Sequence, residues 1–257
     1  MDAFAECYSP VEGKLNRKQR FLAGHPYCCF CGGVARSTTV DHVPPKACFP
    51  VGHWPETFEF PACDRCNHGT TMHDQIFGFY SMLLDFDGTN ISKADIAKLK
   101  SGIENNYPGA LPNIGVPLFH QIGFAVSKPR ALGEAATVVG RKLACALYYR
   151  EGKKALTTGH SIMTGWHQIQ NLNTAALTEY FARLLPDRTI SSRSNIKRYG
   201  QRFAYLSGIK VKEEFFVYAA QFGMGLMVWG IATGPDVVVG EPLGSMAWRV
   251  RGFGDDS

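Results

Sequence analysis

The 257-residue sequence predicts an α+β protein, in which a small module at residues 1–90 precedes a larger α+β domain at residues 91–257. Two observations predict this division. Residues 27–66 are dense in Cys, Pro, Gly and His and lack long apolar runs, so this segment cannot build a core from side chains alone. From residue 75 onward, apolar residues at helical spacing come first and runs of β-branched and aromatic residues follow, which indicates helices and then strands.

The composition is that of a globular protein with a mild positive charge. Hydrophobic residues make up 45% of the chain, charged residues make up 19%, and the formal net charge is +5. This balance excludes a disordered chain and favours polyanionic partners only weakly, because many soluble enzymes carry a similar charge. The first seven residues show neither the basic nor the apolar segment of a secretory signal. We therefore expect a cytoplasmic protein without a disulfide framework.

Local patterns place the individual elements. Helices are expected at residues 11–24, from 75 onward, and at 91–106, 134–151 and 171–185. The first helix is basic and ends at Gly24, and the third is capped by Ser92 with Asp95 three residues later. Residues 109–129 are rich in Pro and Gly and are expected to form a loop with short strands. Strands are expected at 203–206, 214–222, 226–233 and 236–239.

Residues 215–235 contain no charged residue and are long enough to span a bilayer. Several glycines interrupt the stretch, and aromatic and β-branched residues flank the segment from Gly223 to Gly225 on both sides. We therefore interpret the stretch as two buried strands joined near these glycines, and we expect no membrane partner.

The cysteines show the spacing of a metal site. Two Cys-x-x-Cys pairs are formed by Cys28, Cys31, Cys63 and Cys66. Such pairs allow four thiolates to surround one tetrahedral Zn²⁺, and Gly32-Gly33 permits the tight turn after the first pair. Buried free thiols do not explain two matched pairs, and a redox motif predicts one pair only. Cys29 could replace a member of the first pair only at poorer spacing, and Cys7, Cys48 and Cys145 are expected to pack in the interior.

Between the two pairs lies Asp41-His42, followed by Pro44-Pro45, and the second pair runs straight into Asn67. Phosphodiester hydrolysis needs a base that activates water and a cation that binds the phosphate. Neighbouring strand residues point to opposite sides, and a proline break can re-aim them. A neutral imidazole suits the base, while carboxylate and amide oxygens suit Mg²⁺ or Mn²⁺. In isolation, Asp41-His42 also fits a capped turn, and Asn67 fits a helix cap.

The combination Cys-x-x-Cys, Asp-His-x-Pro-Pro-Lys and Cys-x-x-Cys-Asn resembles the zinc-containing HNH endonucleases, whose module has a ββα-metal fold. The resemblance covers about residues 26–80. It implies that His42 is the general base and that Asp41 and Asn67 hold one catalytic divalent cation, with His73 and Asp74 assisting. Many members also have an asparagine before the second cysteine pair that orients the base. Here that stretch is 56–60, in which Glu56 or Thr57 would have to substitute.

The resemblance implies a nucleic-acid substrate, with DNA as the first expectation. Phosphate contacts are expected from a group of cations in the second half of the chain, namely Arg188, Arg193, Lys197, Arg198 and Arg202. The basic segment from Lys14 to Arg20 is the alternative. One site cuts one strand, so double-strand cleavage would need a homodimer or successive nicks. Two alternatives without catalysis stay open: an inactive zinc-stapled module that binds nucleic acid, and a zinc-stapled interaction protein.

Overall fold

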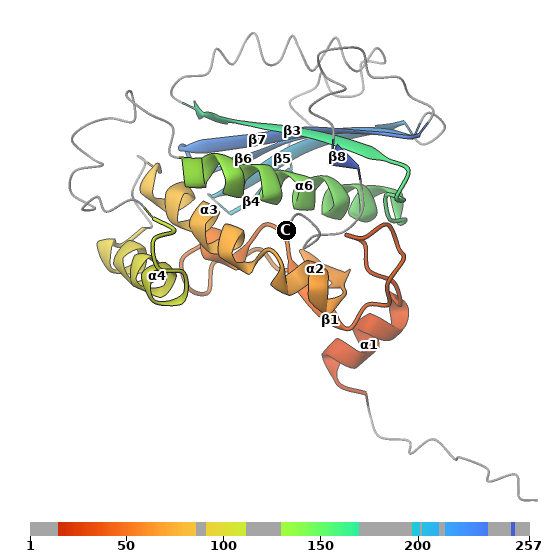
Figure 1. The fold of residues 1–257 in the computed structure, drawn as a ribbon, viewed down its shortest axis with the longest axis horizontal. Helices are drawn as coiled ribbons and strands as arrows, with labels where there is room; N and C mark the ends of the chain where they lie inside the picture. The colour runs from red at the N-terminus through yellow and green to blue at the C-terminus, as the bar shows by residue number, and fades with distance from the viewer. Residues whose placement is uncertain are drawn as a thin grey trace, which may run out of the picture.

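The structure is a computed structural model that describes residues 15–85, 91–111, 130–169, 197–200, 202–210, 214–235 and 248–249. It is a mixed α+β protein, as the sequence predicts (Figure 1). Its first elements are α1 (Arg17–Gly24), β1 (Thr39–His42), the 3₁₀ helix η1 (Lys46–Cys48), β2 (Glu59–Ala62), α2 (Asp64–His68) and α3 (Thr71–Leu83). They are followed by α4 (Lys93–Asn106), α6 (Arg130–Gly152), β3 (Ser161–Gln168), β4 (Lys197–Tyr199), β5 (Phe203–Lys210), β6 (Phe215–Phe222), β7 (Leu226–Thr233) and β8 (Trp248–Arg249).

The strands form two antiparallel sheets. A two-stranded sheet pairs β1 with β2, and a six-stranded sheet has the order β4-β5-β6-β7-β3-β8. Strands β6 and β7 form a hairpin whose turn contains Gly223 with a φ of 55°. The interpretation of the uncharged stretch as two joined strands is therefore confirmed. Among the described helices, none combines the length and the apolar character needed to cross a bilayer.

The predicted helices agree with the structure where it describes them. Helix α1 ends at Gly24, and α4 is capped by Ser92, whose hydroxyl accepts a hydrogen bond from the Asp95 amide at 3.0 Å. Helix α3 begins at residue 71, four residues before the predicted start, and β5 extends beyond the predicted residue 206 to residue 210. Strands β3, β4 and β8 were not predicted. The expected helix at 171–185, the strand at 236–239 and residues 112–129 lie outside the described residues.

Helix α6 lies along one face of the six-stranded sheet, and α3, α2 and the β1–β2 pair lie on the same side of the sheet (Figure 1). One hydrophobic cluster runs from Phe30 through Tyr148 on α6 to Ala232 on β7. Phe58, just before β2, packs its ring edge-on against Phe203 of β5, with ring centroids 5.5 Å apart. The cysteine-rich segment and the large sheet therefore share buried apolar surface. The division of the chain into two domains stays a prediction.

Helix α3 meets η1 at a position where only glycine fits. A Cβ atom on Gly78 would lie 2.6 Å from the carbonyl oxygen of Ala47. Alanine normally stabilises a helix by up to about 1 kcal/mol relative to glycine. We expect Gly78→Ala to lower the free energy of unfolding instead, by about 1–3 kcal/mol, because helix and 3₁₀ turn must separate.

Gly102 provides the control for this substitution, because it lies inside α4 and a Cβ atom there would meet nothing within 4 Å. We expect Gly102→Ala to raise the unfolding free energy by up to about 1 kcal/mol. Urea unfolding of the two variants and the wild type compares these opposite signs. An increase for both variants would show that α3 and η1 are not closely packed.

Candidate metal centre and catalytic site

The four predicted cysteine ligands come together. The sulfur atoms of Cys28, Cys31, Cys63 and Cys66 all lie within 4.8 Å of one another. A tetrahedral zinc with sulfur ligands at about 2.3 Å places its sulfurs about 3.8 Å apart, so the cluster is consistent with a zinc site. The amides of Phe30 and Ala35 donate hydrogen bonds of 3.4 Å to the sulfurs of Cys28 and Cys31. Such bonds stabilise thiolate charge and orient metal ligands.

Local backbone geometry explains how the two pairs close around the site. Gly32 and Gly33 adopt φ values of 74° and 76°, and a Cβ atom on Gly32 would lie 2.8 Å from the amide nitrogen of Thr158. Cys63 is the N-cap residue of α2, and Cys66 lies one turn later in the same helix. The tight turn and the helix each present two thiols to one point.

The other described cysteines are packing residues. Cys29, Cys48 and Cys145 are buried and lie outside the four-sulfur cluster. Burial raises the pKa of the Cys48 thiol to about 12 and also raises the pKa of Cys29. Thiols held neutral in this way are inert core groups. The expectation for Cys48 and Cys145 is confirmed, and Cys7 lies outside the described residues.

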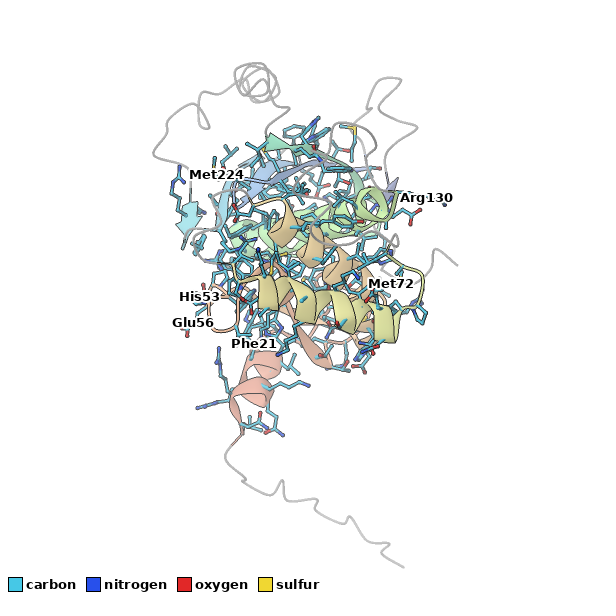
Figure 2. All side chains as sticks on the ribbon, turned by 90° about the vertical axis from the view of Figure 1, so that its left-hand side faces the viewer. Phe21, His53, Glu56, Met72, Arg130 and Met224 are labelled. Carbon is cyan, nitrogen blue, oxygen red and sulfur yellow. The ribbon has the colours of Figure 1, made fainter. Side chains whose placement is uncertain are left out.

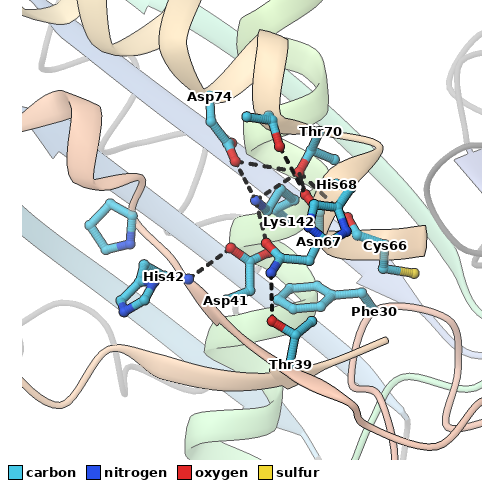
Figure 3. A network of polar contacts seen from close by, with 12 residues as sticks. Phe30, Thr39, Asp41, His42, Cys66, Asn67, His68, Thr70, Asp74 and Lys142 are labelled. Atoms are coloured by element: carbon cyan, nitrogen blue, oxygen red, sulfur yellow. Dashed lines mark hydrogen bonds and ion pairs between the residues drawn. The ribbon is translucent and has the colours of Figure 1, made fainter. Parts of the chain in front are cut away.

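Asp41 and His42 end strand β1 and point to opposite sides of the β1–β2 pair. The Asp41 residue is 4% exposed, whereas the His42 side chain is 28% exposed. The strand stops at His42, ahead of Pro44 and Pro45. The Asp41 Oδ1 atom accepts a hydrogen bond of 2.7 Å from the His42 amide, as Figure 3 shows. One side chain therefore faces the interior and the other is open to solvent.

The surroundings of His42 favour a neutral imidazole. Its ring meets the Trp54 ring edge-on, with centroids 4.9 Å apart. Burial lowers the pKa of His42, and the nearby charge of Lys46 lowers it further. Its Nε2 atom lies 3.9 Å from the Glu59 carboxylate, which is the cross-strand partner of His42 on β2. A neutral, partly exposed imidazole beside a carboxylate is suited to accept a proton near pH 7.

Glu59 therefore occupies the place for which Glu56 or Thr57 was expected. Glu56 is exposed and lies at the outer edge of the loop that also carries His53 (Figure 2). Thr57 has a φ of 76°, and its carbonyl oxygen accepts a hydrogen bond from Arg150. The register of β1 against β2 decides which side chain faces His42, and a motif alone does not contain that register.

Asn67 follows the last cysteine ligand directly and lies in α2. Its side-chain amide donates a hydrogen bond of 2.9 Å to the Thr39 hydroxyl. Residues 39 and 41 of a strand share one face, so this bond holds Asn67 on the face of β1 that carries Asp41. Figure 3 shows Asn67 beside Asp41. The amide oxygen of Asn67 accepts no hydrogen bond within the described part of the chain.

Lys142 of α6 is the residue of this site that was not predicted. Its ammonium lies 2.9 Å from Asp41 Oδ2, 2.7 Å from Asp74 Oδ2 and 2.9 Å from the Thr70 hydroxyl (Figure 3). The Lys142 side chain is 1% exposed. Burial favours a lower pKa for Lys142, but the charges of Asp41 and Asp74 outweigh it and raise the pKa. The lysine is therefore a fixed cation between two carboxylates.

A signal for Lys142 was present in the sequence. The residue stands on the buried face of α6, between Val139 and Ala146 in the i, i+3, i+4 pattern of apolar positions. A lysine is almost never fully buried unless it is paired. Its place in this stripe indicates a buried anionic partner, although the stripe does not say which one.

The two residues expected to assist the cation have different surroundings. Asp74 is bound through Oδ2 to Lys142, and burial raises its pKa to about 6. Its Oδ1 atom is buried and makes no hydrogen bond among the described residues. His73, the neighbouring residue on α3, is half-buried, and burial lowers its pKa. Lys142 thus links Asp74 to Asp41, whereas no described contact links His73 to Asp41.

The predicted phosphate-binding cations also differ in their surroundings. Arg202 is 7% exposed and binds Asp85 together with the carbonyl oxygens of Cys48 and Ser81, which argues against a phosphate contact. Lys197 is exposed and pairs with Glu151, and Arg198 is exposed. Arg188 and Arg193 lie outside the described residues.

Helix α1 is the basic segment that lies next to the candidate site. Its cations Arg17, Lys18 and Arg20 are all exposed, and the helix projects from the rest of the molecule (Figures 1 and 2). Arg17 forms an ion pair of 3.0 Å with Glu59, the carboxylate beside His42. Helix α1 therefore brings at least one cation close to the carboxylate that faces His42.

Comparisons with protein-family models, with curated proteins and with solved structures find no match for this chain. The resemblance to the HNH endonucleases therefore rests on the motif residues themselves.

Proposed function

We propose that this protein is a zinc-stapled HNH-type endonuclease that hydrolyses phosphodiester bonds in nucleic acid, with DNA as the first substrate to test. One observation carries the proposal. Strand β1 of the antiparallel β1–β2 pair ends in Asp41 and His42, and helix α2, which begins at the second cysteine pair, brings Asn67 beside Asp41 (Figure 3). The order of two strands and a helix is the arrangement that the motif resemblance implies.

His42 is the general base of the proposed reaction. A carboxylate beside Nε2 favours the tautomer that carries its proton on Nε2, so Nδ1 is the nitrogen that accepts a proton from water. Trp54 packs against the ring and limits its rotation. The partial exposure of His42 leaves room for the water and for the phosphate that it attacks.

Asp41 and Asn67 are the residues that would hold the catalytic cation. Carboxylate and amide oxygens are the ligands that Mg²⁺ and Mn²⁺ prefer, so the donor set fits. The His42 amide and Lys142 contact one Asp41 oxygen each, and each oxygen keeps a second lone pair. When bound, the cation supplies positive charge to the scissile phosphate and the leaving oxygen.

A second candidate function is favoured by the same lysine. Because Lys142 already neutralises Asp41, the site keeps its shape without a divalent cation. That property suits a catalytically inactive zinc-stapled module that binds nucleic acid through its basic surface, and α1 supplies such a surface.

The two candidates are separated by incubating zinc-loaded protein with supercoiled plasmid in Mg²⁺, in Mn²⁺ and in EDTA. We expect nicked or linear product with either divalent cation and intact plasmid in EDTA, because EDTA removes the cation that the reaction needs. The ratio of nicked to linear product reports on dimer formation. Salt-dependent DNA binding without cleavage of plasmid, single-stranded DNA or RNA would support the inactive binding module instead.

A further inference from the structure

We propose that the Lys142 ammonium is a built-in cation of the candidate site, which competes with the divalent cation for Asp41 and so sets the affinity of the site for that cation. The inference rests on the proposed function only in taking Asp41 as a cation ligand. It assigns Lys142 as a positioning residue, since a side chain that is 1% exposed cannot reach a substrate.

The surroundings of Lys142 resemble a cation-binding shell. Three oxygens lie within 2.9 Å of its Nζ atom: those of Thr70 and Asp74 accept hydrogen bonds from the ammonium, and Asp41 Oδ2 forms an ion pair with it. Two of these oxygens are carboxylate oxygens, and oxygens of this kind are also the preferred ligands of hard divalent cations. The lysine therefore occupies a place where a metal ion would find suitable ligands.

The charge balance gives the direction of the effect. Asp41 and Asp74 carry two negative charges and Lys142 carries one positive charge, so the buried group retains one net negative charge. A divalent cation on Asp41 must approach an ammonium that contacts the same carboxylate. Repulsion between charges a few ångströms apart is strong where water is largely absent. The ammonium therefore weakens divalent binding, and its removal should strengthen it.

Lys142 cannot easily move away when a cation binds. Its neighbours Leu143 and Ala144 are buried in the core, and α6 packs against both α3 and the sheet. The competition is consequently built into the fold. The same packing links Asp41 in β1 to Asp74 in α3 through a residue of a third element.

The chain also offers a matched control. Arg202 and Asp85 form a second ion pair of low exposure, with side chains 7% and 9% exposed. That pair joins the residue before β5 to the residues after α3 and contacts none of Asp41, His42 and Asn67. Arg202→Met therefore removes a buried cation of structural importance without touching the candidate site.

The experiment measures Mn²⁺ binding by calorimetry and by the loss of the free-ion electron paramagnetic resonance signal. It compares zinc-loaded wild type with K142M, D74N and R202M. We expect K142M to bind Mn²⁺ about tenfold more tightly or better, because the repulsive charge is gone. D74N should bind more weakly than the wild type, since Lys142 then pairs with Asp41 alone. R202M should bind like the wild type.

Zinc content and circular dichroism show whether each variant is folded. Should K142M fail to fold, the double variant D74N/K142M removes one charge of each sign and carries the same expectation of tighter binding than wild type. The inference would be overturned if folded K142M bound Mn²⁺ no more tightly than the wild type. The same holds for the folded double variant where K142M does not fold.

Cleavage is not part of this readout. Tighter Mn²⁺ binding by K142M together with an inactive wild type would support the inference and count against the nuclease. An active wild type, together with a K142M variant that binds Mn²⁺ no more tightly than the wild type, would support the nuclease and overturn the inference.

Discussion

Replacing His42 by alanine is expected to lower the rate of cation-dependent cleavage by about 10²–10⁴-fold, the usual contribution of a general base. The substitution should leave the fold intact, because the side chain is 28% exposed and makes no hydrogen bond through its ring among the described residues. Asp41 and Asn67 are unchanged in this variant, so its affinity for Mn²⁺ should remain that of the wild type. Single-turnover cleavage at saturating protein and Mg²⁺ measures the effect.

His53→Ala is the matched control for this loss. His53 is exposed on the loop between β1 and β2, and its ring contacts the carbonyl oxygen of Val51 rather than the candidate site. We expect this variant to cleave at the wild-type rate, because no group of the proposed site changes. If His42→Ala retained a rate within about threefold of wild type, another group would have to serve as the base.

The parts of the structure that could be predicted are those with local signals. Two Cys-x-x-Cys pairs contain their own ligand spacing, and the four sulfurs meet as expected. Ser92 caps α4 by accepting a hydrogen bond from the amide of Asp95, three residues later. The turn at Gly223 lies inside the uncharged stretch 215–235, which it divides into two strands. In each case the residues that decide the structure are close together in the sequence, so a short window is sufficient.

The missed parts depend on residues that are distant in the chain. Lys142 and Asp41 come from separate elements, and no local pattern pairs them. Arg202 stands in a run of cations, where exposure is the ordinary expectation, yet its partner Asp85 lies 117 positions away. Strand β3 was missed as well. Its Gly165 is a weak strand residue that is explained only by the neighbouring β7, where Trp229 occupies the space of a Cβ atom.

The proposed zinc site has ligands from two short segments, but these segments also pack in the apolar core. Cys66→Ser is expected to abolish zinc binding and to destabilise the protein by several kcal/mol. Zinc-finger peptides gain about 10–16 kcal/mol of folding free energy from their metal. This protein also has an apolar core, so its folding should depend less on the metal. Cys66 lies in α2 immediately before Asn67, so its loss should displace Asn67 and stop cleavage as well. Zinc analysis after gel filtration and thermal unfolding with and without chelator measure both effects.

Cys29→Ala separates the loss of a zinc ligand from the loss of a buried thiol. Cys29 is fully buried next to Cys28, yet its sulfur lies outside the four-sulfur cluster. We expect this variant to keep its zinc and to lose about 1–2 kcal/mol, since only packing changes. A chelator should then lower the melting temperature of the wild type and of Cys29→Ala, but not that of Cys66→Ser. Equal chelator sensitivity in all three would show that the four thiols do not hold a structural metal. In that case α2, and with it Asn67, would be positioned by the apolar core alone.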